Sequence, residues 1–156
     1  KEHLIWVENG WKTWSVKNKQ NSVNFELACT MNGHIVWCSY AYFHNWHDVS
    51  IYKDRLMLLL EENECVLGDK AYQGPENTIV PIKTKKNRPQ LSSGDWEHNS
   101  FIHKHRAIIE NVNAWLKNWN IINCGFSTRD LDFINGTVLI ISNLCNLKHS
   151  KDWICS

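Results

Sequence analysis

The sequence predicts a mixed α/β domain in which strands meet first along the chain and helices then cover the sheet. Three observations support this prediction. Apolar and polar residues alternate in two neighbouring runs, short apolar runs follow in the middle of the chain, and long segments with helical spacing close it. The predicted order is strand, strand, helix, strand, strand, long helix, helix, and 156 residues suffice for one domain, residues 1–156.

A hairpin is the most specific local signal. Residues 23–30 alternate as a half-buried strand does, and residues 34–40 read as the returning strand. Between them lies Asn32-Gly33, a dipeptide that favours a tight turn. Residues 11–17 are a candidate third antiparallel neighbour.

A helix is predicted after the hairpin. The run from Val49 to Glu62 has helical character, and Asp48 in front of it is a candidate N-cap. The apolar side of this helix would carry Ile51, Leu56, Leu59 and Leu60.

The second half of the chain begins with two short strands. Residues 64–68 form an apolar run that ends in glycine and presents Asp69, and the proline in residues 79–82 favours a sheet edge. Residues 84–98 are polar and predict a loop. Apolar residues at helical spacing then predict a long helix over 99–119 and a closing helix over 132–148.

Composition is that of a globular protein, with 43% hydrophobic and 21% charged residues. A net charge of +1 is lower than most DNA-binding proteins show, but local patches decide binding. One such patch groups Lys83, Lys85, Lys86 and Arg88, and a weaker one pairs Lys17 with Lys19. A solvated loop is the alternative reading of each patch. Since no apolar run reaches about 18 residues, no membrane span is predicted.

The six cysteines contain no C-x-x-C pair. Without a secretory signal they are most simply reduced and buried, which predicts an intracellular protein. Zinc ligation would require closer ligand spacing. The first residues, Lys1 onward, read as the middle of a longer protein.

Two acidic residues are candidates for chemistry. Asp69 follows a buried strand, and its alternative reading is a turn aspartate. Glu110 lies on the long helix four residues after Arg106 and seven before Lys117, so these three side chains share one face, together with His103. This face is either a solvated i, i+4 salt bridge or a metal-binding glutamate beside cations that hold a phosphate.

The pattern R-x3-E-x6-K on a helix, preceded by D-x-[GA]-[YF] after a strand, resembles the catalytic signature of DDE transposases. It is most like that of the Harbinger and related insertion-sequence branch. The matching residues are Asp69 to Tyr72, then Arg106, Glu110 and Lys117. Forty residues lie between the two carboxylates, a gap of the kind this branch shows. His103 stands where related enzymes often have tyrosine.

Four further segments resemble the same branch in the same order. Residues 14–19 are similar to its Y-S-G-K-K-K segment, with Val16 in place of glycine, and residues 32–37 to its N-G-x-I-V-W hairpin. Residues 46–48 are similar to G-S-x-H-D, again without the glycine, and residues 110–117 to E-N-V-N-A-x-L-K. The resemblance therefore extends over nearly the whole chain.

The resemblance implies an RNase H-like fold and a site with two divalent cations, Mg²⁺ with Mn²⁺ as a substitute. Asp69 and Glu110 would be the catalytic carboxylates and metal ligands. Arg106 and Lys117 would orient the glutamate or contact DNA phosphate. The remaining candidates for orienting or phosphate contact are His103, Lys83, Lys85 and Lys86.

The third carboxylate of the family is expected about two residues before Lys1. The chain is therefore predicted to lack this aspartate and most of the first strand. Asp48 is the acidic neighbour that could approach the site, and an N-cap role for it is an equal alternative.

Three hypotheses for function follow. The chain is the core of an active metal-dependent DNA nuclease and strand-transferase, or a decayed or host-adopted remnant that binds DNA or a partner without cutting; another RNase H-like nuclease is the third. The expected partners are DNA, a separate DNA-binding protein and a second copy of the chain, without a membrane. A nuclear location is implied if the source is eukaryotic.

Overall fold

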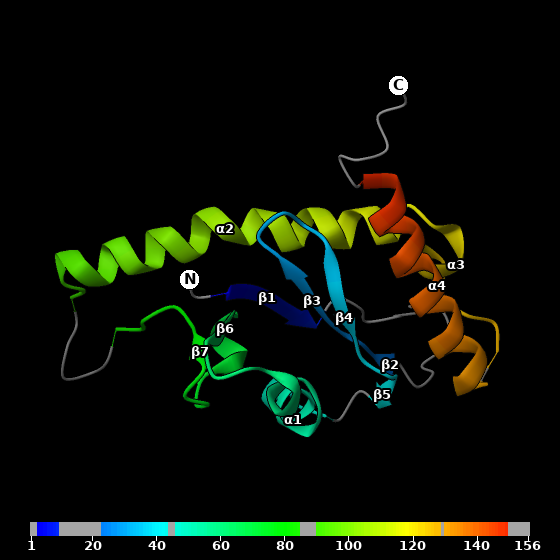
Figure 1. Cartoon of the computed structure of the whole chain (residues 1–156), viewed down its shortest axis with the longest axis horizontal. Helices are drawn as coiled ribbons and strands as arrows, with labels where there is room; N and C mark the ends of the chain where they lie inside the picture. The colour runs from blue at the N-terminus through cyan, green and yellow to red at the C-terminus, as the bar shows by residue number, and fades with distance from the viewer. Residues whose placement is uncertain (1–2, 10–22, 44–45, 85–89, 129, 150–156) are drawn as a thin grey trace.

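The structure is a computed structural model that describes residues 3–9, 23–43, 46–84, 90–128 and 130–149 (Figure 1). Several features named above lie outside these ranges, namely the candidate strand at 11–17, Lys17, Lys19, Lys85, Lys86, Arg88 and Cys155. Of the helices in the described ranges, none has the length and apolar character needed to cross a bilayer.

A five-stranded mixed sheet forms the centre of the domain, in the order β4-β3-β1-β6-β7. β1 pairs antiparallel with β3 and parallel with β6, so the middle of the sheet joins segments from distant parts of the chain. The strands are β1 (His3–Asn9), β3 (Glu26–Thr30), β4 (Ile35–Cys38), β6 (Glu64–Leu67) and β7 (Thr78–Ile79). A separate ladder pairs β2 (Val23–Asn24) with β5 (Tyr42–Phe43).

This mixed sheet with flanking helices is compatible with the expected RNase H-like architecture. We expected most of the family's first strand to be missing from the chain, and the structure does not show that it is. A seven-residue strand, β1, instead occupies the centre of the sheet at residues 3–9, where no strand was predicted.

The hairpin is confirmed between β3 and β4. Gly33 has φ +81°, a backbone conformation that favours glycine, and its N–H donates to the carbonyl of Thr30 at 2.9 Å. The space beside Gly33 is also limited, because a Cβ there would lie 3.2 Å from the ring of Trp115. The turn is thereby placed against the long helix.

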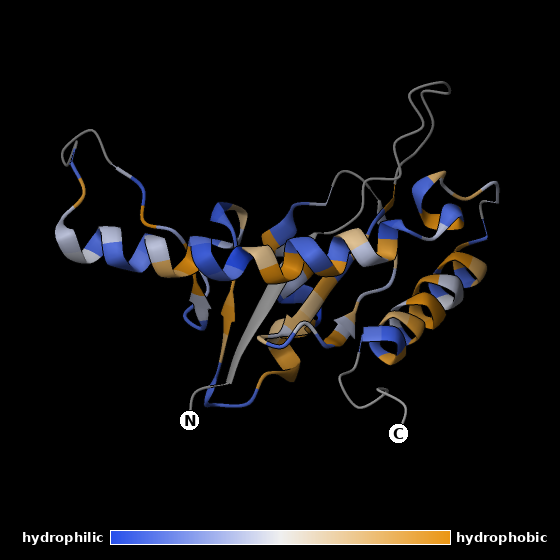
Figure 2. Cartoon of the chain, turned by 90° about the horizontal axis from the view of Figure 1, so that it is seen from above, coloured by the Kyte–Doolittle hydropathy of each residue, from blue (hydrophilic) through white to orange (hydrophobic). Residues whose placement is uncertain are grey.

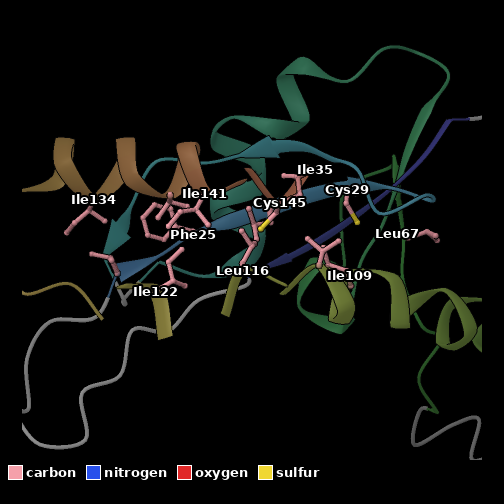
Figure 3. Packing of buried hydrophobic residues seen from close by; sticks show 14 of the residues in the cluster. Phe25, Cys29, Ile35, Leu67, Ile109, Leu116, Ile122, Ile134, Ile141 and Cys145 are labelled. Carbon is pink, nitrogen blue, oxygen red and sulfur yellow. The ribbon is translucent and has the colours of Figure 1, made fainter. Parts of the chain in front are cut away.

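Helices cover both faces of the sheet: α2 (Ser93–Lys117) crosses one face and α1 (Asp48–Asp54) lies on the other (Figure 1). The α2 face is packed by Phe25, which lies between β2 and β3, and by Leu27 and Cys29 of β3 (Figure 3). The α1 face holds Ala28 and Val66, with aromatic residues around them. The remaining helices are η1 (Leu56–Leu59), η2 (Lys70–Tyr72), α3 (Asn120–Asn123) and α4 (Leu131–His149).

The long helix starts six residues before its predicted beginning at 99, so the prediction of a loop through residue 98 is wrong. Ser92 is the N-cap: its hydroxyl accepts from the N–H of Asp95, and the Asp95 carboxylate accepts from the N–H of Ser92. This reciprocal pair satisfies two backbone donors that a helix start leaves without intrahelical partners.

The helix predicted over 49–62 is shorter than expected. α1 ends at Asp54, and the chain continues as the 3₁₀ turn η1 after Arg55, whose φ of −137° is not helical. Leu59 is consequently 61% exposed, although the helical pattern placed it on the apolar side, whereas Leu56 is buried.

The closing helix α4 is fastened to β4 by a side-chain amide. Asn146 accepts from the N–H of Ile35 and donates to its carbonyl, both at 2.8 Å. Nearby, Asn135 accepts from the N–H of Ala41 at 2.8 Å. Figure 2 shows α4 as hydrophobic along much of its length, and its apolar side chains divide between the core and the surface: Val138 and Ile141 are buried, while Phe133 and Leu147 are exposed.

Candidate active site

Asp69 lies at the carboxyl-terminal end of β6, as predicted. β6 runs parallel to β1 with Leu67 opposite Trp6, so Asp69 follows at the sheet edge toward which both strands run. The side chain is half-buried and caps η2, since its Oδ1 accepts from the N–H of Ala71 at 2.7 Å. This hydrogen bond fixes the direction of the carboxylate.

The turn that carries Asp69 is closed by Tyr72. The Tyr72 side chain is fully buried, and a Cβ at residue 68 would lie 2.9 Å from the Cβ of Tyr72. A contact this short is not tolerated, so glycine at position 68 lets the tyrosine fold back over the end of the strand. Gly68 and Tyr72 thereby set the position of Asp69 between them.

Glu110 is paired with Arg106 on α2. The Arg106 Nε lies 2.9 Å from the Glu110 Oε1, and the two side chains are 45% and 57% exposed. His103 and Lys117 are also exposed on this helix, and one continuous helix from Ser93 to Lys117 keeps the spacing that places these side chains on one face. Both readings of the face, a surface salt bridge and an oriented catalytic glutamate, include this ion pair.

The core joins the two segments that carry these carboxylates. Leu67, two residues before Asp69, and Ile109, next to Glu110, belong to one packed cluster (Figure 3). Their carboxylates are oxygen ligands of the kind that Mg²⁺ prefers. Among the described residues, however, no group of three or more His, Cys, Asp or Glu side chains is arranged to hold a metal ion.

Asp48 is not the N-cap of α1. His47 occupies that position, its carbonyl accepts from the N–H groups of Ser50 and Ile51, and Asp48 is the first helical residue. A carboxylate in the first turn still suits the positive end of the helix. The charge of Asp48 also acts on Glu26, a residue that we did not single out from the sequence.

Glu26 is a fully buried carboxyl group on the α1 face of β3. Burial raises its pKa from 4.5 to about 8. The Tyr72 hydroxyl and the Trp37 indole N–H act as hydrogen-bond donors that lower this pKa, and the charge of Asp48 raises it. Within the described part of the chain, neither oxygen of Glu26 has a partner at ordinary hydrogen-bond geometry, so these donors contact it loosely.

The alternation of the strand concealed Glu26, because its polar positions suggested a face open to water. Both faces of the sheet are in fact covered, and Asn24 and Glu26 are buried beside the apolar residues. One signal could have indicated that Glu26 is buried. The helix predicted after the hairpin has to pack on a face of the sheet, and that face is then closed to water.

The remaining predicted features are tested only in part. Lys83 is exposed, and the rest of its basic patch lies outside the described ranges. The five cysteines that the structure describes are free thiols; Cys29 and Cys145 are buried, whereas Cys124 is exposed, contrary to the prediction that all are buried.

A comparison with protein families identifies the class to which the chain belongs. The family described as DDE superfamily endonuclease matches residues 7–146, which is most of the chain. The chain therefore belongs to the DDE superfamily endonuclease family. No curated protein and no solved structure matches it.

Proposed function

We propose that the chain is the core of a metal-dependent DNA endonuclease or transposase that hydrolyses phosphodiesters with two divalent cations. The observation that carries this proposal is membership of the DDE superfamily endonuclease family over residues 7–146. The order of the motifs around Asp69, Arg106, Glu110 and Lys117 supports placing it in the Harbinger and related branch.

Asp69 and Glu110 are the proposed metal ligands, with Mg²⁺ as the resident ion and Mn²⁺ as a substitute. Two such cations would activate the attacking oxygen and stabilise the leaving one during in-line displacement. The chain contributes orientation: the Ala71 N–H holds the Asp69 carboxylate and the Arg106 guanidinium holds that of Glu110. Asp48 is a weaker candidate ligand.

The basic side chains on and near α2 are proposed to contact DNA phosphate. His103 and Lys117 are exposed on the helix that carries Glu110, and Lys83 is exposed on the segment after β7. Exposed basic side chains at such positions can fix the register of a duplex without reading its sequence. We therefore assign the reading of the DNA sequence to a separate partner protein or an upstream segment. The chain is proposed to assemble with a second copy of itself. Its proposed location is the nucleus, if the source is eukaryotic.

The test is nicking of supercoiled plasmid by the full-length protein in Mn²⁺. Asp69→Asn removes the charge but keeps an oxygen that can accept from Ala71, so the turn survives. Its matched control is Asp130→Asn, because Asp130 caps α4 through hydrogen bonds from Asp132 and Phe133. Glu110→Gln is paired with Glu97→Gln, a change at an exposed residue of the same helix.

We expect the wild-type protein and both controls to nick, and both site variants to fall to the background of the protein-free reaction. Nicking that persists in Asp69→Asn or Glu110→Gln would remove that residue from the site. If the folded wild-type protein binds DNA in a gel-shift assay yet does not nick it, the non-cutting remnant is the correct reading.

A further inference from the structure

Glu26 lies where four separate elements meet. It belongs to β3, and the groups that act on its carboxyl come from Trp37 in β4, Tyr72 in η2 and Asp48 at the start of α1. Main-chain bonds fix the Glu26 backbone, since its N–H donates to the Ser39 hydroxyl at 2.8 Å and its carbonyl accepts from the Ser39 N–H at 2.9 Å. The carboxyl therefore projects from a rigid position.

Tyr72 connects this buried carboxyl to the candidate active site. Its hydroxyl interacts with Glu26, its ring packs edge-on against Tyr52 at 5.9 Å, and its Cβ closes on Gly68. Its backbone N–H donates to the carbonyl of Asp69 at 3.2 Å. Any movement of the tyrosine therefore moves the turn whose first residue is Asp69.

We propose that Glu26 is a positioning residue for Asp69: its buried carboxyl lies beside the Tyr72 hydroxyl and keeps Tyr72 seated over Gly68, and this seating fixes the η2 turn that presents the Asp69 carboxylate at the end of β6. The activity part of this inference rests on the proposed function. The positioning part rests on geometry and can be measured without activity.

The protonation state of Glu26 explains which substitution keeps the arrangement. Because burial places its pKa at about 8, the group is mainly a neutral carboxylic acid at pH 7. A glutamine has the same length, is neutral, and offers both an acceptor and a donor. Glu26→Gln should preserve the contact with Tyr72, whereas Glu26→Leu removes it at similar size.

The first readout is hydrogen exchange at the backbone N–H of Ala71, the group that donates to the Asp69 carboxylate. Glu26→Leu and Tyr72→Phe are expected to speed this exchange roughly tenfold, because each change removes one side of the buried polar contact beside the turn. Glu26→Gln is expected to leave it unchanged.

The matched control is Tyr52→Phe. Tyr52 is equally buried in the same cluster, and its hydroxyl donates to the Asn77 Oδ1 at 2.8 Å. The control therefore loses a tyrosine hydrogen bond in the same core and leaves the Tyr72 hydroxyl in place; the Tyr52 hydroxyl interacts with Glu26 through charge and donates its hydrogen bond to Asn77. A purely structural role of Tyr72 predicts equal exchange at Ala71 in both phenylalanine variants, and this result would overturn the proposal.

The second readout is Mn²⁺-dependent nicking by the full-length protein. We expect Tyr72→Phe to raise the Mn²⁺ concentration for half-maximal nicking several-fold, and Tyr52→Phe and Glu26→Gln to leave it unchanged. If Tyr72→Phe nicks at the wild-type Mn²⁺ concentration while Asp69→Asn is inactive, the positioning inference is wrong and the proposed function stands. Activity of Asp69→Asn contradicts the proposed function, and the exchange measurement then still decides whether Glu26 positions the turn. If Glu26→Leu does not fold, Tyr72→Phe decides by itself.

Discussion

A Cβ atom at residue 68 would lie 2.9 Å from the Cβ of Tyr72, closer than two such atoms can approach. The absence of a side chain at Gly68 is what lets the chain turn back over β6 and leaves Asp69 at the edge of the sheet. The fully buried Tyr72 thus fixes the half-buried Asp69 by packing on Gly68, the residue before the aspartate.

Gly68→Ala is expected to destabilise the fold by about 1–3 kcal/mol, the range for overpacking a core. The measurement is the free energy of unfolding in urea. Gly94→Ala is the control, since a Cβ there would lie 4.0 Å from the Ser92 hydroxyl, an ordinary contact. Gly94 lies in the first turn of α2, so alanine should be neutral or slightly stabilising. Equal effects at the two positions would show that the contact with Tyr72 is relieved cheaply.

Asn146→Ala is expected to cost about 1–3 kcal/mol, because both backbone groups of Ile35 would lose their partner in a partly buried site. Asn143→Ala, three residues earlier on α4, should change little. Its amide donates to the Leu139 carbonyl of its own helix, and it is exposed. Thermal or urea unfolding of the two variants tests the difference, and similar stabilities would contradict it.

Glu26 makes stability depend on pH. Its pKa is 4.5 when unfolded and about 8 when folded, so between these values only the folded state holds the proton. The free energy of unfolding therefore falls as pH rises through this window, by at most about 1.4 kcal/mol per pH unit, and Glu26 adds no further change above it.

Glu26→Gln should remove this contribution. Urea unfolding at several pH values between 5 and 8.5 should show the variant gaining stability relative to wild type as pH rises (roughly the window set by these pKa values). The neighbours that act on this carboxyl, Asp48, Tyr72 and Trp37, are present in both proteins, so the difference isolates Glu26. Parallel pH profiles would mean that the carboxyl is ionised in the folded state.

The Arg106–Glu110 pair should contribute little to stability. Both side chains are about half exposed, and exposed i, i+4 pairs are worth about 0.3–0.5 kcal/mol. A double-mutant cycle with Arg106→Ala and Glu110→Ala should give a coupling of this size that shrinks in 1 M NaCl (where the screening length is about 3 Å). A coupling several times larger, insensitive to salt, would indicate a pair shielded from water. A small value would leave the proposed orienting role as the reason for the pairing.

The elements that the sequence predicted correctly are those with local causes. Asn32-Gly33 predicts the hairpin because glycine readily adopts the positive φ that a tight turn needs, and Gly33 has this φ. The preference depends on the residue itself and little on distant parts of the chain. The two long helices follow from apolar spacing, yet the start of α2 was missed. Its signal, Ser92 with Asp95, lies in a polar stretch without periodicity, and only the capping bonds reveal it.

The features that escaped prediction depend on distant parts of the chain. β1 is a strand because residues 3–9 pair with both Glu26–Thr30 and Glu64–Leu67. Glu26 is buried because α1 covers a face that alternation alone leaves open. For the candidate site, the sequence identified Asp69 and Glu110 from their motifs and order, but the role of Tyr72 as a link required coordinates.

The amide of Asn146 has one more consequence. β4 is an edge strand, and Asn146 satisfies both the N–H and the C=O of Ile35 in the way a further strand would. Open strand edges recruit other chains and promote aggregation. During synthesis Asn146 leaves the ribosome 111 residues after Ile35. A nascent or truncated chain without α4 is therefore expected to self-associate through β4, so α4 protects the folded domain from this association.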